Sequence, residues 1–150
     1  MPISFRMPEE FSDLSSIFDK GRRMDVKIQF TNQTICGSDF APSDGVGAVV
    51  EFRGIVRGVE REAKISGLMY EIYEPMADRM VRRIVEELNA EYPCLAFLVV
   101  HRHGLVPVGE TAIYVRIEAR HRTEAIRMLE HFMNRLKADV PIWKAGSMPC

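Results

Sequence analysis

The sequence lacks the features that mark membrane and secreted proteins. Its longest unbroken apolar run is Cys94 to Val100, seven residues, whereas a transmembrane helix needs about 20. It has three cysteines, Cys36, Cys94 and Cys150, an odd number without metal-ligand spacing, which is typical of a reducing cytosol. Residues 1–21 lack the apolar core of a secretory signal. We therefore expect a cytoplasmic protein without a signal peptide.

An excess of charge of one sign is also missing. The net charge is −1, divided as −2 over residues 1–50, −2 over 51–100 and +3 over 101–150. No run of basic residues with interleaved aromatics is present, so we expect no nucleic-acid partner, and we expect no membrane partner either. A basic final third in a nearly neutral chain indicates a local site for a small anion.

The length and composition are those of one globular domain. The chain has 150 residues, of which 47% are hydrophobic and 27% charged, enough to bury a core without disulfides. We find no internal repeat. Residues 1–23 are expected to be an N-terminal extension in which 11–18 have helical spacing, and residues 24–150 are expected to form the domain.

Apolar periodicity predicts the main elements. Strands are expected over Val26–Phe30, Gly47–Arg57, Lys64–Tyr73, Leu95–Val100 and Thr111–Glu118, helices over residues 75–92 and Thr123–Lys137, and an extended segment over Val140–Trp143. The charged turn from Gly58 to Ala63 is expected to join the second and third strands as a hairpin. Gly54, inside a strand, indicates a bulge or a close approach to the backbone. The predicted fold class is α+β, a mostly antiparallel sheet covered by two main helices.

Cations at the ends of these elements are the candidate site residues. His121 and Arg122 precede the second helix, whose N-terminus attracts a phosphate or carboxylate. Lys137 ends that helix. Lys144 follows Trp143, and an apolar wall with nearby cations would favour a neutral, nucleophilic amine.

Each candidate has a structural alternative that the residues alone leave open. Arg122 would pair with a nearby glutamate in a solvated loop. Lys137 would simply interact with the negative end of the helix dipole. Arg57, at the end of a strand, would face solvent near Glu60 and Glu62.

Signals for other chemistries are weak. His101 and His103 occupy alternate positions, but no third ligand at diagnostic spacing accompanies them, so we expect no metal site and interpret them as polar residues at a turn edge. No phosphate-binding glycine loop and no serine nucleophile motif is present.

Short segments in one order along the chain resemble the molybdopterin synthase catalytic (large) subunit family. The resemblance covers roughly residues 24–144. The segments that carry it are Gly47–Arg57, Leu68–Glu71, Tyr73–Met76, Val100–Arg102, Gly104–Leu105, Val108–Glu110, His121–Arg122, Leu136–Lys137 and Val140–Lys144.

This resemblance implies an α/β-hammerhead-like fold and a sulfurtransferase. The family takes sulfur from the C-terminal thiocarboxylate of a small ubiquitin-like carrier with a Gly-Gly tail. It inserts two sulfurs into cyclic pyranopterin monophosphate to make molybdopterin. The implied partners are that carrier and a second copy of the chain, as a homodimer within a heterotetramer. No cofactor and no metal is implied.

The resemblance also implies the site. Lys137 would be the catalytic amine and Lys144 would assist it. The substrate-binding residues would be Ile55, Val56, Arg57, His121, Arg122, Lys137 and Lys144. Fixed positive charge suits a reaction between two anions, the phosphate of the precursor and the thiocarboxylate of the carrier.

The chain departs from the family pattern at three places, and one of them is residues 1–23, for which we recognise no counterpart. Ala145 and Gly146 follow Lys144, where the family has a basic residue and a glutamate, and Gly58 replaces an asparagine after Arg57. Two alternatives therefore remain: a non-catalytic relative that binds the carrier or a phosphorylated pterin, and a binding module for another phosphorylated metabolite.

Overall fold

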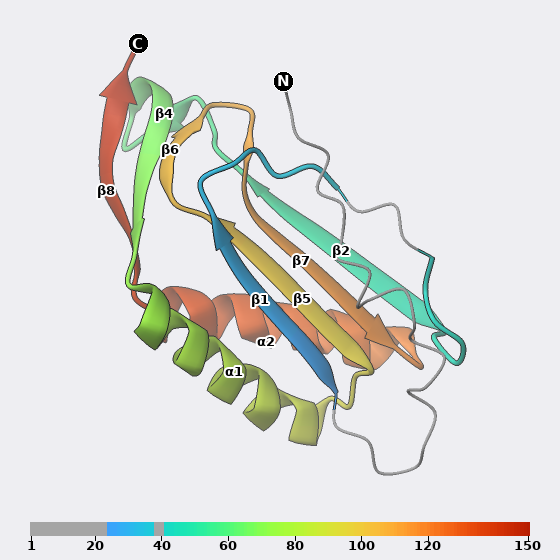
Figure 1. Ribbon diagram of the computed structural model, residues 1–150. Helices are drawn as coiled ribbons and strands as arrows, with labels where there is room; N and C mark the ends of the chain where they lie inside the picture. The colour runs from blue at the N-terminus through green and yellow to red at the C-terminus, as the bar shows by residue number, and fades with distance from the viewer. Residues whose placement is uncertain (1–23, 38–40) are drawn as a thin grey trace.

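Two β-sheets and two helices make up the architecture (Figure 1). The computed structural model describes residues 24–37 and 41–150. In chain order the elements are β1 (Asp25–Thr31), β2 (Ala48–Ile55), β3 (Val59–Glu60), β4 (Ala63–Ile72), α1 (Glu74–Glu91), β5 (Ala96–Arg102), β6 (Gly104–Pro107), β7 (Thr111–Ala119), α2 (Arg122–Asp139) and β8 (Ile142–Pro149). The α+β fold class is confirmed. The helix expected over residues 11–18 lies outside the described residues.

The first sheet has the strand order β1-β5-β7-β2. β1 runs parallel to β5, and the other two pairs are antiparallel. Every residue of the two central strands, β5 and β7, is buried. A continuous apolar run is what a strand covered on both faces requires, so the short run before His101 predicted β5 correctly.

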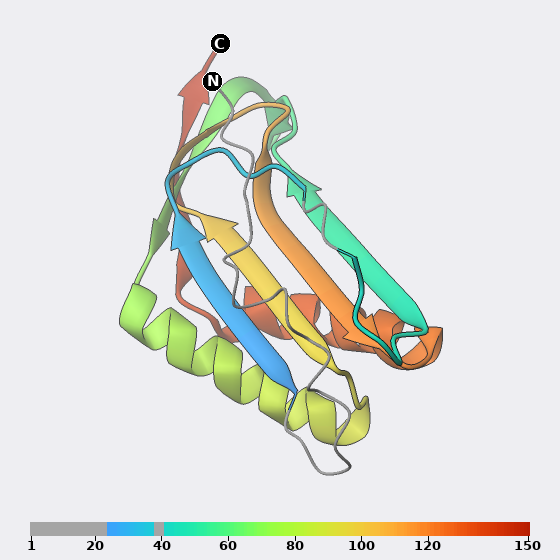
Figure 2. The same ribbon diagram turned by 45° about the vertical axis from the view of Figure 1, so that its right-hand side comes forward.

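Both helices cover one face of this sheet (Figure 2). α1 begins with Pro75 in its first turn and buries a stripe that includes Val81 and Val85. Phe97 of β5 meets Phe132 of α2 edge to face, with ring centroids 4.7 Å apart, and burial of each such ring contributes about 1.5–3 kcal/mol. This packing fixes the direction of α2 and so the place where its last turn ends. Neither helix of the described ranges has the length and apolar character that crossing a bilayer requires.

The second sheet is built around β4. β6 and β8 pair with its two sides, and β3 pairs with its first residues, all antiparallel. A small core joins this sheet to the first one and consists of Val56, Ile65, Leu68, Val106 and Ala112. The sheet stands at one end of the first sheet, near the C-terminus (Figure 1).

The hairpin predicted from the turn at Gly58–Ala63 is wrong. β2 pairs with β7 in the first sheet, whereas β4 belongs to the second sheet. The reason is a register shift between Gly54 and Ile55, where the chain leaves the first sheet and crosses to the second. Only the short β3 forms a hairpin with β4.

Two strands of the second sheet differ from the sequence prediction. β6 begins at Gly104, which has a φ of 80°, in a segment for which the sequence analysis predicts no strand. The extended segment expected to end at Trp143 continues as β8 to Pro149. Both strands exist because β4 offers them an edge, which is a long-range pairing that a local pattern does not contain.

Gly54 is tightly packed, as its position inside a strand predicted. A Cβ placed there would lie 2.7 Å from Cγ2 of Ile113. We expect Gly54→Ala to lower the free energy of unfolding by about 1–3 kcal/mol, because a buried side chain must move to admit the methyl group. Urea denaturation measures the change. Gly146→Ala is the matched control, since no atom lies within 4 Å of its Cβ, and an equal loss in the two variants would contradict the packing argument.

Candidate functional site

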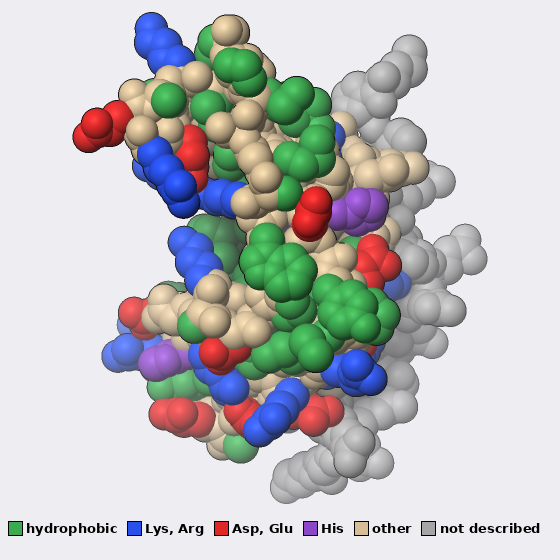
Figure 3. Space-filling view, turned by 90° about the vertical axis from the view of Figure 1, so that its left-hand side faces the viewer, with side chains coloured by type: hydrophobic (Ala, Val, Ile, Leu, Met, Phe, Trp, Pro, Cys, Tyr) green, Lys and Arg blue, Asp and Glu red, His purple; other side chains and the backbone are tan. Residues whose placement is uncertain are grey.

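A pocket of about 560 Å³ opens where the two sheets meet the last turns of α2. The hollow is visible in Figure 3, with basic side chains on both of its edges. Its walls come from seven elements and the link after β2. The residues that line it are Phe52, Gly54, Ile55, Val56, Arg57, Glu60, Leu68, Tyr70, His101, Ala112, Ile113, Met133, Leu136, Lys137, Ile142 and Lys144.

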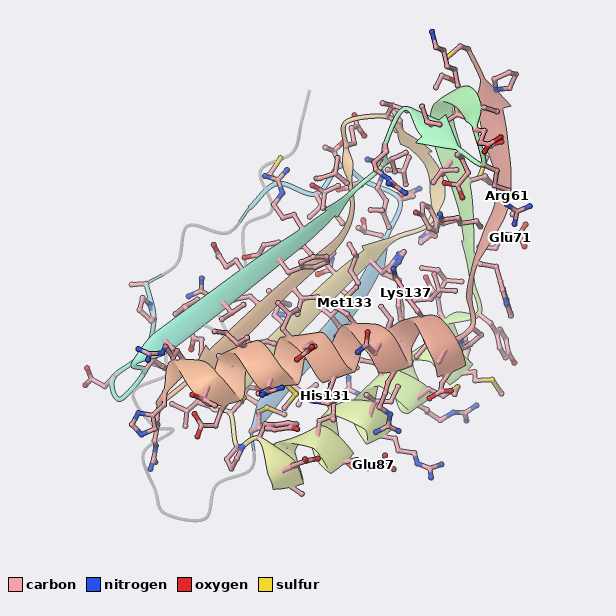
Figure 4. The ribbon with its side chains drawn as sticks, turned by 180° about the vertical axis from the view of Figure 1, so that it is seen from behind. Arg61, Glu71, Glu87, His131, Met133 and Lys137 are labelled. Atoms are coloured by element: carbon pink, nitrogen blue, oxygen red, sulfur yellow. The ribbon has the colours of Figure 1, made fainter. Side chains whose placement is uncertain are left out.

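The pocket brings together three of the predicted cations. Arg57 follows β2, Lys137 lies in the last turn of α2, and Lys144 lies on β8. Figure 4 shows Lys137 and Met133 pointing from the same side of α2 toward the strands. Three positive charges on one concave surface form a site for an anion. Arg57 and Lys137 are exposed charges at the ends of elements, as the structural alternative expects, and they also line this pocket.

His121 and Arg122 lie elsewhere. They mark the beginning of α2, whereas Lys137 lies at its end. With a rise of 1.5 Å per residue, the fifteen residues between Arg122 and Lys137 separate them by roughly 22 Å along the helix. Neither residue lines the pocket. A single chain thus brings together Arg57, Lys137 and Lys144 but not the His-Arg pair.

The surroundings of Lys144 differ from the sequence prediction. Its neighbour Trp143 is 54% exposed and does not line the pocket, because adjacent residues of a strand point to opposite faces. Instead, Nζ of Lys144 donates a hydrogen bond to Oε1 of Glu60 at 2.9 Å. The ion pair lowers the pKa of the Glu60 carboxyl, which therefore stays ionised at neutral pH.

Ile55 and Val56 line the pocket with their side chains rather than with free backbone groups. The N–H of Val56 donates to the carbonyl oxygen of Glu110, and its own carbonyl accepts from the N–H of Gly109. Ile113 occupies the space beside Gly54. The N–H and carbonyl groups of Val56 are therefore already paired within the chain.

Two neutral polar groups complete the pocket. Tyr70 and His101 meet edge to face, with ring centroids 5.4 Å apart. Nδ1 of His101 lies 2.8 Å from the carbonyl oxygen of Arg102, and since a carbonyl only accepts, Nδ1 carries the proton and Nε2 is an acceptor. Burial lowers the pKa of His101 to about 4. Burial, and then the charge of Glu60, raises the pKa of the Tyr70 hydroxyl.

Sequence reasoning missed Glu60, Tyr70 and His101 as pocket residues. Tyr70 and His101 lie inside segments that carry the family resemblance, which was the available signal. The interpretation of His101 as a polar residue at a turn edge is wrong, because it is 6% exposed. His103 instead faces Glu74, with 3.7 Å between Nε2 and the carboxylate. Within residues 24–37 and 41–150, no group of three or more His, Cys, Asp or Glu side chains is placed to hold a metal ion.

Comparisons with known proteins agree with this geometry. The family model described as "MoaE protein" matches residues 26–139. The molybdopterin synthase catalytic subunit of Rattus norvegicus is 32% identical over 139 residues, which are 91% of this chain and 68% of the rat protein. The crystal structure of molybdopterin synthase from Staphylococcus aureus superposes with a TM-score of 0.68 at 30% identity, over 86% of this chain and 97% of that one.

A third comparison bears on the fold alone. A structure described as the protein–protein complex of subunits 1 and 2 of molybdopterin-converting factor from Helicobacter pylori has a TM-score of 0.60 at 19% identity. The match covers 83% of this chain and 89% of the other.

The buried His101 predicts a specific loss of stability in acid. Its pKa of about 4 lies below the ordinary value of about 6.5, so between these values the unfolded chain binds a proton that the folded chain does not. From pH 7 to pH 5 this group should lower the free energy of unfolding by about 2 kcal/mol. Urea denaturation at both pH values measures the loss, which should be about 2 kcal/mol smaller in His101→Gln. The control is His121→Gln, which changes an exposed histidine and should lose as much free energy of unfolding between pH 7 and pH 5 as the wild type. If His101→Gln also loses as much as the wild type, His101 is not held neutral in the folded chain.

Proposed function

This chain belongs to the MoaE protein family, and on that premise we propose that it is the catalytic subunit of a molybdopterin synthase. The observation that carries the proposal is the convergence of Arg57, Lys137 and Lys144 on one pocket. The reaction joins sulfur from a thiocarboxylated carrier to cyclic pyranopterin monophosphate, and both reactants are anions. A pocket with an excess of fixed positive charge offsets their mutual repulsion.

Lys137 is the proposed catalytic residue. Among the described residues, no carboxylate forms an ion pair with it, so its amine remains available to the carrier thiocarboxylate. Met133 and Leu136 of the same helix line the pocket beside it and supply apolar surroundings. Its amine would act there as an acid–base group or as a transient nucleophile. Arg57 would hold an anionic group of the precursor.

His121 and Arg122 require a second copy of the chain. A substrate in the pocket of one chain does not reach the beginning of the same α2, which lies roughly 22 Å away. We propose that these two residues bind the precursor from the partner in a homodimer. The beginning of α2 then supplies donors and the positive end of a helix dipole to the precursor's phosphate.

The carrier is the other proposed partner. One chain of the Helicobacter pylori complex of subunits 1 and 2 has the same fold as this chain. This likeness supports a carrier that docks on this chain with its Gly-Gly tail in the pocket. The proposed assembly is a heterotetramer. The proposed location is the cytoplasm, consistent with the free thiols of Cys36, Cys94 and Cys150. Residues 24–150 are the proposed catalytic domain, with 1–23 as an extension.

Reconstitution tests the function directly. The purified chain is mixed with a thiocarboxylated carrier and cyclic pyranopterin monophosphate, and the product is scored as its oxidised fluorescent derivative. Product formation supports the proposal. Carrier binding without product would instead indicate the non-catalytic relative, and binding of neither reactant would indicate a module for another phosphorylated metabolite.

Lys137→Ala should lower turnover about a hundredfold or more, because the reacting amine is lost. The fold should survive, since Lys137 is exposed, so the thermal midpoint and the dissociation constant of the carrier should change little. Lys64→Ala is the matched control: it removes an exposed lysine that does not line the pocket. Near-normal turnover by Lys137→Ala would remove Lys137 from the mechanism.

Subunit mixing tests whether two chains build one site. Arg122→Ala should weaken binding of the precursor, and Lys137→Ala should lack turnover, so each variant alone is nearly inactive at low precursor concentration. After exchange of subunits at equal amounts, half of the dimers are mixed and each contains one intact site, which restores about a quarter of wild-type turnover. No recovery, in a mixture shown by mass spectrometry to contain mixed dimers, would mean that Arg122 does not act across the interface.

A further inference from the structure

Glu60 stands out among the residues that line the pocket because it is the one carboxylate there within the described ranges. Its side chain is 24% exposed, against 51% for Lys144, with which it pairs. Arg57 and Lys137 form no such pair with any residue that the structure describes. The lining thus carries three cations and one carboxylate; Lys144 donates a hydrogen bond to this carboxylate, and the charge of Arg57 also lowers its pKa.

The hairpin that carries Glu60 is strained. Glu60 is paired with Ala63 in the β3–β4 ladder, so the connection consists of Arg61 and Glu62 alone. Both have left-handed backbones, with φ values of 49° and 67°. A two-residue turn of this kind favours Asn and Gly, because most residues with a side chain are strained in that conformation. Figure 4 shows Arg61 at this tip, beside the second sheet.

This strain has a consequence for the pocket. A tight turn fixes the register of β3 against β4, and the alternation of a strand then decides which face each side chain takes. Val59 points outward and is 51% exposed, so Glu60 points inward, where it meets Lys144 of β8. Lys144 in turn is held opposite Tyr70 by the β4–β8 register. The ion pair between Glu60 and Lys144 therefore joins β3 to β8, two strands that pair with different parts of β4.

From these observations we infer that Glu60 is a positioning residue for Lys144: it holds that ammonium group at the pocket wall, and it leaves Lys137 as the unpaired amine. The inference rests on the proposed function for its kinetic consequence but not for the pairing itself. A lysine side chain loses rotamer entropy when it is held in one geometry. Without the carboxylate, Lys144 would sample many rotamers, and the net charge of the pocket would become more positive by one.

Two opposite effects are therefore expected from Glu60→Gln. Turnover should fall about tenfold, because Lys144 is no longer held in one orientation. Inorganic phosphate should bind about two- to fivefold more tightly, because a negative charge has left the pocket. A general loss of structure would weaken both turnover and phosphate binding, so the split between them is diagnostic of positioning.

Lysine labelling tests the pairing without any substrate. The chain is treated with a limiting amount of an amine-acylating reagent, and modification of each lysine is followed by mass spectrometry. In Glu60→Gln, Lys144 should react about two- to fivefold faster than in the wild type, while the rate at Lys137 stays the same. Glu62→Gln is the matched control, since it changes an acidic residue of the same turn that does not line the pocket.

The outcomes separate this inference from the proposed function. Unchanged labelling of Lys144 in Glu60→Gln, or unchanged turnover together with unchanged phosphate affinity, would overturn the role of Glu60. Equal effects of Glu60→Gln and Glu62→Gln would also overturn it. If the wild type makes no dithiolene product but Lys144 responds as expected in labelling and phosphate binding, the proposed function fails and the positioning role stands. A Glu60→Gln/Lys144→Ala double variant should lose no more turnover than Lys144→Ala alone.

Discussion

Positive charge that is held in one pocket without full neutralisation is the constraint on which the rest of this structure depends. Arg57, Lys137 and Lys144 repel one another, and a flexible surface would let them separate. Here each is carried by a rigid element or by the chain just after one, and these elements come from both sheets and α2. The end of α2 also favours a cation such as Lys137 through the helix dipole. Packing thus offsets the repulsion.

The two sheets contribute differently to this constraint. The first sheet and its helices form the large core that orients α2. The second sheet has a core of only five buried residues, yet it carries Glu60 on β3, Tyr70 on β4 and Lys144 on β8. Its order depends on pairing with β4 more than on burial. Lys137, the proposed catalytic residue, therefore stands on the part of the fold with the large core, and Glu60, Tyr70 and Lys144 stand on the smaller part.

Most of the fold could be predicted from local patterns, and the site only in part. The periodicity of α1 and α2 and the apolar run of β5 placed these elements correctly, because each buries a face that the sequence itself displays. The pairing of β2 with β7 instead of β4 could not be predicted, since a register shift at Gly54 redirects the chain. The candidate cations were predicted from the sequence. That Lys137 lies in the pocket while Arg122 lies at the other end of α2 depends on the length and orientation of this helix, which local patterns do not give.

The remaining polar groups of the pocket are tuned so that its charge does not vary near neutral pH. Burial lowers the pKa of His101 to about 4, burial raises that of Tyr70, and Lys144 lowers that of Glu60. Each shift favours the form that the group already has at neutral pH, so none of the three changes its charge there. These three groups therefore present a constant charge to Lys137, the proposed catalytic residue.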